Sequence, residues 1–232
     1  MTKKINNEIQ LLELFIDPEL NKEAVRKPFS NNGKICATDT RILIVIDEDV
    51  TTGQYEPQTL NIAKAIPNDN IKLEIKVSDL EATLSKLPQV PEKYLITPEV
   101  ECTECDDMCE VDWEYTDKRG YTHREAFECP ICKGTGIAAR AVYGKTGNYI
   151  PDEEAIVKIQ NGQKFLAQYL HKLLQAAKIL GSDTILYTSQ GKVRGNVFTF
   201  TGTFADAVKV VIMPNSNEAD IMLYTKRLTK SK

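Results

Sequence analysis

The chain has 232 residues, of which 42% are hydrophobic and 27% charged, and its 29 basic and 33 acidic residues give a formal net charge of −4. This balance excludes a wholly disordered chain, and the longest apolar run, Ile42–Ile46, is too short to span a membrane. A protein that bound nucleic acid through its overall charge would be basic, so any DNA-binding surface must be local. The first ten residues lack the long apolar core of a secretion signal, so we expect a cytoplasmic protein with no membrane partner.

The N-terminal part of the chain predicts antiparallel strands. Lys34–Asp47 is rich in β-forming residues and follows the pair Asn32-Gly33. Both residues of that pair tolerate the positive φ that a type I′ turn requires, so we expect a hairpin at residues 23–46. Strict alternation of apolar and polar residues predicts a further strand at Ile71–Val77.

A short helix should follow this strand. Ser78 is expected at its N-cap, with Glu81 completing a capping box, and Pro88 should end the helix. The residues that would form its buried stripe are Leu80, Leu84 and Leu87.

Residues 98–136 have a different composition. Eleven acidic and four basic side chains give this segment a net charge of −7, and its few aliphatic residues cannot form an apolar core. Five of the six cysteines lie between Cys102 and Cys132, which in a chain without a secretion signal favours a metal site over disulfides. The two C-x2-C pairs can place four thiolates around one ion in the tetrahedral geometry of structural zinc, and we expect one Zn²⁺ per chain. The ligands would be Cys102, Cys105, Cys129 and Cys132.

A β-hairpin is expected between the two cysteine pairs, with strands Val111–Tyr115 and Tyr121–Phe127 around a turn at Asp117–Gly120. Disulfides and an iron–sulfur cluster could use the same cysteines. Cys109 and His123 are further candidate ligands, although we expect a thiol outside the site and a surface histidine. A closed four-cysteine site leaves no open coordination position, so its expected role is structural.

The second cysteine pair continues as CPICKGTG, residues 129–136, which resembles the C-x2-C-x-G-x-G repeats in the cysteine-rich region of DnaJ co-chaperones. Gly134 and Gly136 match both glycine positions, where the chain folds back tightly beside the metal. The first pair departs from this pattern, because Asp107 and Cys109 occupy the glycine positions. Two repeats rather than four imply one zinc ion, and no J-domain signature is present.

The C-terminal part predicts a second amphipathic helix and further strands. The helix would cover Gly162–Leu180, with a buried stripe of Leu166, Leu170 and Leu173 and a C-terminal cap at Gly181. Strands are expected at Thr184–Thr188, Val197–Thr201 and Val208–Met213, with turns at Gly191 and Gly202, and the basic tail TKRLTKSK should be frayed. The fold class is therefore α+β: residues 1–97 and 141–232 form the two halves of one domain, and residues 98–140 form an inserted zinc-ribbon or β-hairpin module.

No catalytic constellation is apparent in the sequence. Neither histidine, His123 or His171, belongs to a nucleophile motif. Gly144-Lys145-Thr146 matches the end of a phosphate-binding loop, but Ala139 stands where its first glycine belongs. We therefore expect a protein that is not an enzyme.

Two stretches resemble the bacterial DNA sliding clamp, the beta subunit of DNA polymerase III. One is GKICATDTRILIVI (33–46); the other runs from Tyr169 through the helix and the later strands to VKVVIMPN (208–215). The resemblance implies two helices lying on an antiparallel sheet. This chain has room for one such domain, whereas bacterial clamps have three in each subunit.

The clamp resemblance implies a non-enzymatic scaffold of DNA replication or repair. Its expected partners are DNA and replication proteins, and its expected assembly is a ring-like homo-oligomer. A phage or mobile element is one origin considered for such a chain. The candidate DNA-facing residues are Lys164, Gln168, His171, Lys172, Gln175 and Lys178. The alternative is a zinc-stabilised protein-interaction module unrelated to DNA, with the acidic cysteine segment as its docking surface.

Overall fold

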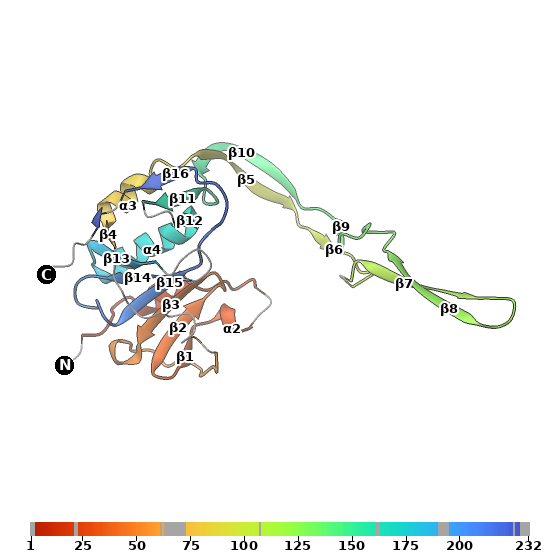
Figure 1. Ribbon diagram of the computed structural model, residues 1–232, viewed down its shortest axis with the longest axis horizontal. Helices are drawn as coiled ribbons and strands as arrows, with labels where there is room; N and C mark the ends of the chain where they lie inside the picture. Colours follow the sequence, from red (N-terminus) through yellow and green to blue (C-terminus); the bar gives the residue numbers. More distant parts are fainter. Residues whose placement is uncertain are drawn as a thin grey trace. The chain divides into compact units, whose positions relative to one another are not determined.

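The computed structural model describes residues 3–20, 23–60, 62, 73–106, 108–160, 163–189, 195–224 and 226–227 (Figure 1). The chain divides into two compact units: a main unit, Met1–Pro88 with Pro151–Lys232, and a cysteine unit, Gln89–Ile150. The cysteine unit is longer at both ends than the expected 98–140 insert. The reason is that β5 (Gln89–Thr97) and β10 (Val142–Pro151) pair with each other rather than with the strands of the main unit.

An eight-stranded antiparallel sheet forms the centre of the main unit. Strands from before the cysteine unit pair with strands from after it at three places in the sheet, so both halves of the main unit build one sheet. The strands, in spatial order, are β1 (Phe29–Asn31), β2 (Lys34–Thr38), β3 (Ile42–Asp47), β15 (Val208–Ile212), β14 (Asn196–Phe200), β13 (Thr184–Thr188), β4 (Leu73–Lys76) and β17 (Lys226–Arg227). The three strands predicted after the second helix are confirmed to within one residue at each end.

The predicted N-terminal hairpin is present but starts later than predicted, because Glu23–Arg26 forms helix α2. Strands β1 and β2 are joined by Asn32 and Gly33, whose φ angles of 49° and 74° are both positive, as a type I′ turn requires. The next strand, β3, is buried on both faces. Ile42, Ile44 and Ile46 join the main core, whereas Leu43 and Val45 belong to a smaller cluster on the other face of the sheet.

The main unit contains four α-helices and one 3₁₀-helix within the described residues. These are α1 (Glu8–Glu13), α2 (Glu23–Arg26), α3 (Val77–Leu84), α4 (Ala167–Leu180) and η1 (Glu48–Val50). None of the described helices is long and apolar enough to cross a membrane.

The capping box predicted at Ser78 is wrong. Helix α3 begins at Val77, its N-cap is Lys76, and no side chain caps it. The chain passes directly from β4 into the helix, because the Val77 backbone N–H donates a hydrogen bond to the Asp183 carbonyl (3.0 Å). This long-range contact replaces the local cap, and Glu81 instead forms an ion pair with Lys178.

The second helix starts later than the sequence predicts. Lys164–Leu166 forms strand β12, which pairs with β11 (Ile156–Ile159), and the helix begins at Ala167. Gly181 caps its end with a φ of 65°, as predicted. Strand β11 also pairs in parallel with β16 (Ile221–Leu223), although the predicted connections were antiparallel. The first two residues of the strand predicted at 71–77, Gly191 and most of the basic tail lie outside the described residues.

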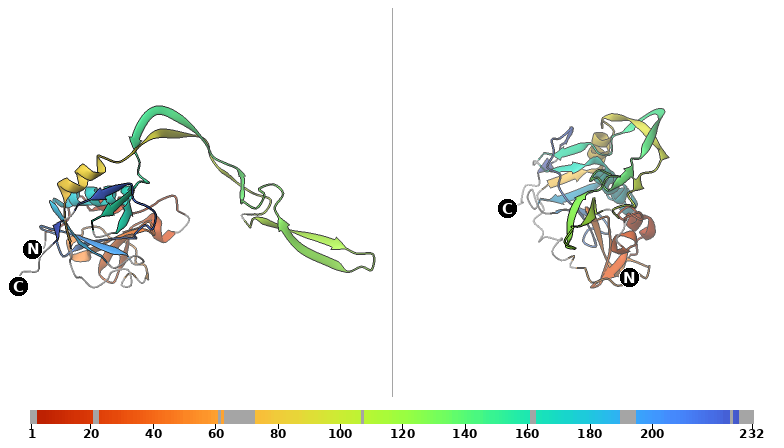
Figure 2. Two further views of the ribbon diagram at one scale, coloured as in Figure 1. Left: turned by 45° about the horizontal axis from the view of Figure 1, so that its top comes forward. Right: turned by 90° about the vertical axis from the view of Figure 1, so that its right-hand side faces the viewer.

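Helices α3 and α4 share one core. Leu80, Leu84 and Leu87 are buried together with Leu170 and Leu173 in a single cluster, which also contains the inward-facing residues of the large sheet. The two helices lie next to each other in Figure 1 and Figure 2, and Lys178 Nζ lies 2.5 Å from Glu81 Oε1 between them. The chain is therefore a mixed α+β protein with a large antiparallel sheet and both predicted leucine stripes in its core.

A buried carboxylate fixes the first helix. Glu8 accepts hydrogen bonds from the Thr52 backbone N–H (2.5 Å), the Thr52 hydroxyl, the Gly53 N–H and the Tyr55 hydroxyl. Burial alone would raise the pKa of Glu8, but these four donors favour the charged form, and the pKa is lowered. The side chain thus ties α1 to the segment that follows η1.

We predict that the main unit folds without the cysteine unit. The Asp152 backbone N–H donates to the Pro88 carbonyl (2.8 Å), so the two points where the cysteine unit leaves the main unit are already adjacent. Replacing Gln89–Ile150 by a Gly-Ser linker of about four residues should preserve a single cooperative unfolding transition, since closing a short loop costs little entropy. Thermal unfolding followed by circular dichroism measures this.

A broad, non-cooperative transition in this deletion variant would contradict the prediction. The matched control deletes α1 instead. That variant should lose cooperative unfolding, because Leu11 and Leu12 of α1 are fully buried in the main core.

Candidate metal centre

Two short antiparallel pairings bring the two cysteine pairs together. Cys102 and Cys105 follow β6 (Val100–Glu101), which pairs with β9 (Ile137–Ala139) after the second cysteine pair. Cys129 and Cys132 follow β8 (Thr122–Glu128), which pairs with β7 (Glu110–Thr116) after the first. Two backbone hydrogen bonds cross between the pairs, from Cys102 N–H to Gly136 O (2.8 Å) and from Cys129 N–H to Cys109 O (3.0 Å).

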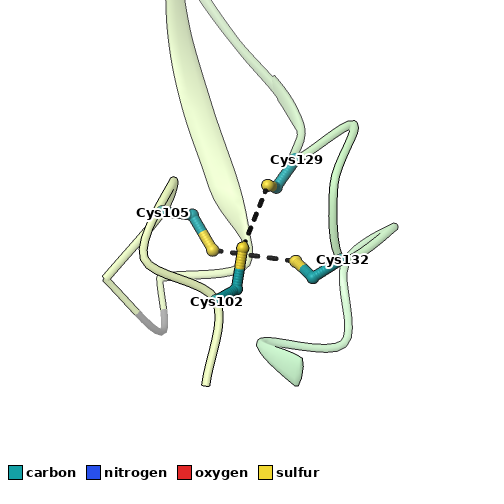
Figure 3. Close-up of side chains that lie close together, drawn as sticks. All are labelled: Cys102, Cys105, Cys129 and Cys132. Atoms are coloured by element: carbon teal, nitrogen blue, oxygen red, sulfur yellow. Dashed lines mark hydrogen bonds between the residues drawn. The ribbon is translucent and has the colours of Figure 1, made fainter. Parts of the chain in front are cut away.

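The four sulfur atoms converge, as Figure 3 shows. All lie within 4.8 Å of one another, and the Cys102–Cys129 and Cys105–Cys132 Sγ–Sγ distances are both 3.7 Å. A tetrahedral zinc site with Zn–S bonds of about 2.3 Å has sulfur–sulfur edges of about 3.8 Å, whereas a disulfide bond is about 2.0 Å long. The spacing therefore fits four ligands of one ion and does not fit disulfides.

The four-sulfur cluster is closed to solvent. The four cysteines are exposed by 6% or less, and Val111 packs against them. An ion held by four buried sulfurs has no position left for a substrate or a water molecule. The chemistry of such a centre is to hold the chain together.

The turns beside both cysteine pairs contain residues with positive φ, in the left-handed region of backbone conformation. Gly134 and Gly136 have φ angles of 72° and 74°, which glycine adopts without strain. The first pair lacks these glycines, and Asp106 (φ 43°) and Cys109 (φ 65°) reverse the chain there. The two turns therefore use the same region of backbone conformation with different residues.

Burial and hydrogen bonding act in opposite directions on the thiols. Burial, with hydrogen bonds to the neighbouring sulfurs, raises the pKa of Cys105 to about 12. Burial opposes ionisation of Cys132 too, but the Gly136 backbone N–H and the neighbouring sulfurs lower its pKa to about 7. A backbone amide directed at a sulfur favours the thiolate, the form that binds a metal.

Cys109 and His123 lie outside the four-sulfur cluster. Cys109 is half-buried and contributes through its backbone, since its carbonyl accepts the hydrogen bond from Cys129 and its N–H donates to the Cys105 sulfur. His123 stacks on Tyr115 and lies 3.4 Å from Asp117 Oδ2. Neither residue is needed to complete a set of four ligands.

The candidate DNA-facing residues are separate from the metal centre, and their charged members already have partners. Five of the six lie on α4, whereas Lys164 lies on β12. Of these six, only Gln175 and Lys178 are exposed rather than half-buried. The contacts are Lys164 Nζ to Asn217 O (2.5 Å), His171 Nδ1 to Glu153 Oε1 (2.8 Å), Lys172 Nζ to Asp39 Oδ2 (3.0 Å) and Lys178 Nζ to Glu81 Oε1 (2.5 Å).

One exposed surface was not among the predicted sites: the aromatic side of the β7–β8 hairpin. Trp113 and Tyr115 alternate with acidic residues along β7, and the register places Phe127 on the same side. Their exposed fractions are 61%, 65% and 48%. Period-two alternation in a predicted strand is the signal that would have found this side.

No family model matches the chain, and no curated protein matches it. Among solved structures, it is similar to a Helicobacter pylori beta clamp bound to a DNA ligase peptide, with 10% identity, a TM-score of 0.48, and coverage of 93% of this chain and 65% of that one. It is also similar to a Pseudomonas aeruginosa DNA polymerase sliding clamp with ligand, with 10% identity, a TM-score of 0.46, and coverage of 90% of this chain and 63% of that one. For Caulobacter crescentus pol III beta the identity is 12%, the TM-score is 0.44, and the coverage is 92% of this chain and 65% of that one. The chain thus spans less than two thirds of the length of these clamps.

We predict one zinc ion per chain in protein purified without added metal, as measured by elemental analysis. Cys129→Ser or Cys132→Ser should lose the ion and unfold the cysteine unit while the main unit stays folded. The physical reason is that metal binding supplies the folding free energy of a small domain without its own apolar core.

The matched control is Cys109→Ser, which should retain a full equivalent of zinc. Less than half an equivalent in the wild-type protein, or two equivalents, would count against the assignment. Equal metal loss in Cys109→Ser and Cys129→Ser would show that the ligand set is wrong.

Proposed function

We propose that this protein is a non-enzymatic scaffold of DNA replication or repair, built from a sliding-clamp-like main unit and a zinc-stabilised insert. One observation carries the proposal. The two stretches with clamp-like sequence form neighbouring strands, because β3 pairs with β15 over the full length from Val208↔Ile46 to Ile212↔Ile42. Helices α3 and α4 then cover that sheet together, which is the arrangement that the sequence resemblance implies.

The distribution of charge supports a local DNA-binding surface. The cysteine unit has 12 acidic and 7 basic residues, and the main unit has 21 acidic and 22 basic residues. The negative charge is thus concentrated in the insert, and the main unit is close to neutral. In this proposal the polar side of α4, with Lys172 and Lys178, faces DNA, and several copies of the chain form a ring.

A specific observation favours a second candidate function, a zinc-stabilised protein-interaction module unrelated to DNA. Lys172 and Lys178 each form an ion pair with a carboxylate, Asp39 and Glu81 respectively. Binding a phosphate would require these pairs to break, which reduces the gain from releasing counterions. The acidic insert would then be the docking surface.

Light scattering combined with DNA binding across a salt series separates the two functions. A scaffold of the first kind should have the mass of a closed oligomer and bind double-stranded DNA with an affinity that falls steeply as salt rises. The double variant Lys172→Gln/Lys178→Gln should lower the slope of log affinity against log salt by about 2, roughly one for each phosphate that a lysine no longer neutralises.

The matched control is Lys27→Gln, an exposed lysine outside α4, which should leave the slope unchanged. A monomer that does not bind DNA at low salt would reject the first function and support the second. DNA binding with equal slopes in all variants would retain DNA as a partner but exclude α4 as the DNA-binding element.

A further inference from the structure

The β7–β8 hairpin has two chemically different faces. It pairs with no other described strand, and its side chains alternate between the faces. The cross-strand pairs on one face are Val111↔Phe127, Trp113↔Glu125 and Tyr115↔His123, and those on the other are Glu110↔Glu128, Asp112↔Ala126, Glu114↔Arg124 and Thr116↔Thr122. We call the first the aromatic face; the second is mainly acidic.

The aromatic face is ordered although it is exposed. Trp113 and Phe127 meet edge to face with their ring centroids 6.0 Å apart, and Tyr115 stacks on His123 at 6.3 Å. Large exposed apolar surface of this kind marks an interaction site more often than a solvated surface. The contacts between the rings thus fix their positions relative to one another on this face.

Glu125 gives this face its chemical selectivity. It lies directly opposite Trp113 and between His123 and Phe127 along β8, and no ion pair to it occurs among the described residues. Its neighbour Arg124 lies on the other face, where it pairs with Glu114. A carboxylate set among aromatic rings suits a guanidinium or ammonium group, which can pair with the carboxylate and lie over a ring.

Charge complementarity identifies the class of partner. Residues 98–136 carry a net charge of −7, and four thiolates around one Zn²⁺ would add a formal −2. Such a field attracts cations and repels phosphates. We propose that the aromatic face binds a segment of another protein that carries both arginine or lysine and apolar side chains. The proposal deepens the second candidate function and holds whether or not the main unit binds DNA.

The metal centre supports the base of this face. Val111 belongs to the aromatic face and also packs against the four cysteines, and Cys129 follows directly after β8. Removing the metal should therefore abolish binding as well as folding of the hairpin.

The test uses the full chain and a synthetic peptide of alternating arginine and leucine. Trp113 is the only tryptophan in the chain, so its fluorescence reports binding directly, and calorimetry gives the affinity. We expect saturable binding that weakens with salt, and a peptide with glutamate in place of arginine should not bind. Glu125→Gln and Tyr115→Ser should each weaken binding about fivefold, because the first removes the ion pair and the second removes an aromatic ring from the face.

The matched control is Asp112→Asn, which removes one negative charge at the neighbouring position on the other face and should stay within about twofold of wild type. Each variant must retain one zinc ion, which separates a binding defect from unfolding.

Four results would overturn the proposal. These are no binding of the arginine–leucine peptide, equal effects of Glu125→Gln and Asp112→Asn, equally tight binding of a single-stranded oligonucleotide, and dissociation of an oligomer by Tyr115→Ser. The last would identify a second copy of the chain as the occupant. None of these experiments uses double-stranded DNA or variants of α4. A negative result for the aromatic face therefore does not affect the DNA-scaffold proposal, which the salt-series experiment tests separately.

Discussion

Four buried sulfurs hold together a segment that has no apolar core of its own. Within the described part of the cysteine unit, the only buried cluster consists of Cys102, Cys105, Cys129 and Cys132, with Val111 packed against it. The surrounding residues 98–136 carry a net charge of −7, which opposes compaction. The crossing backbone hydrogen bonds, the β7–β8 hairpin and its aromatic face all depend on the convergence of these sulfurs. The order of this unit therefore rests on the four cysteines.

The main unit is stabilised differently, because residues from before and after the insert form one apolar core. Strand β3 precedes the insert and pairs with β15, which follows it; β4 and β13 are related in the same way. Neither half can complete the sheet alone. At the insertion point the Pro88 carbonyl accepts a hydrogen bond from the Asp152 backbone N–H, which holds the two ends of the insert next to each other.

Short sequence patterns correctly predicted those features that neighbouring residues alone determine. The Asn32-Gly33 turn, the central strands, the leucine stripes and the two cysteine pairs follow from backbone preference, periodicity and ligand spacing. One error arose where a distant residue decides, because Val77 starts α3 by bonding to Asp183. The other arose where two local patterns compete, because Lys164 forms a short hairpin with β11 although it continues the helical periodicity of the residues that follow. The four donors to Glu8 come from residues more than 40 positions away, so no local signal marked this buried carboxylate.

The central claim is that the metal stabilises the cysteine unit and not the main unit. Hydrogen exchange of the full chain, with and without a chelator, tests it most directly. Metal removal should abolish protection of the Cys102 and Cys129 amides, whose hydrogen bonds cross the site, and leave the β3 and β15 amides protected. Loss of protection in both units together, or no change at Cys102 and Cys129, would contradict this account.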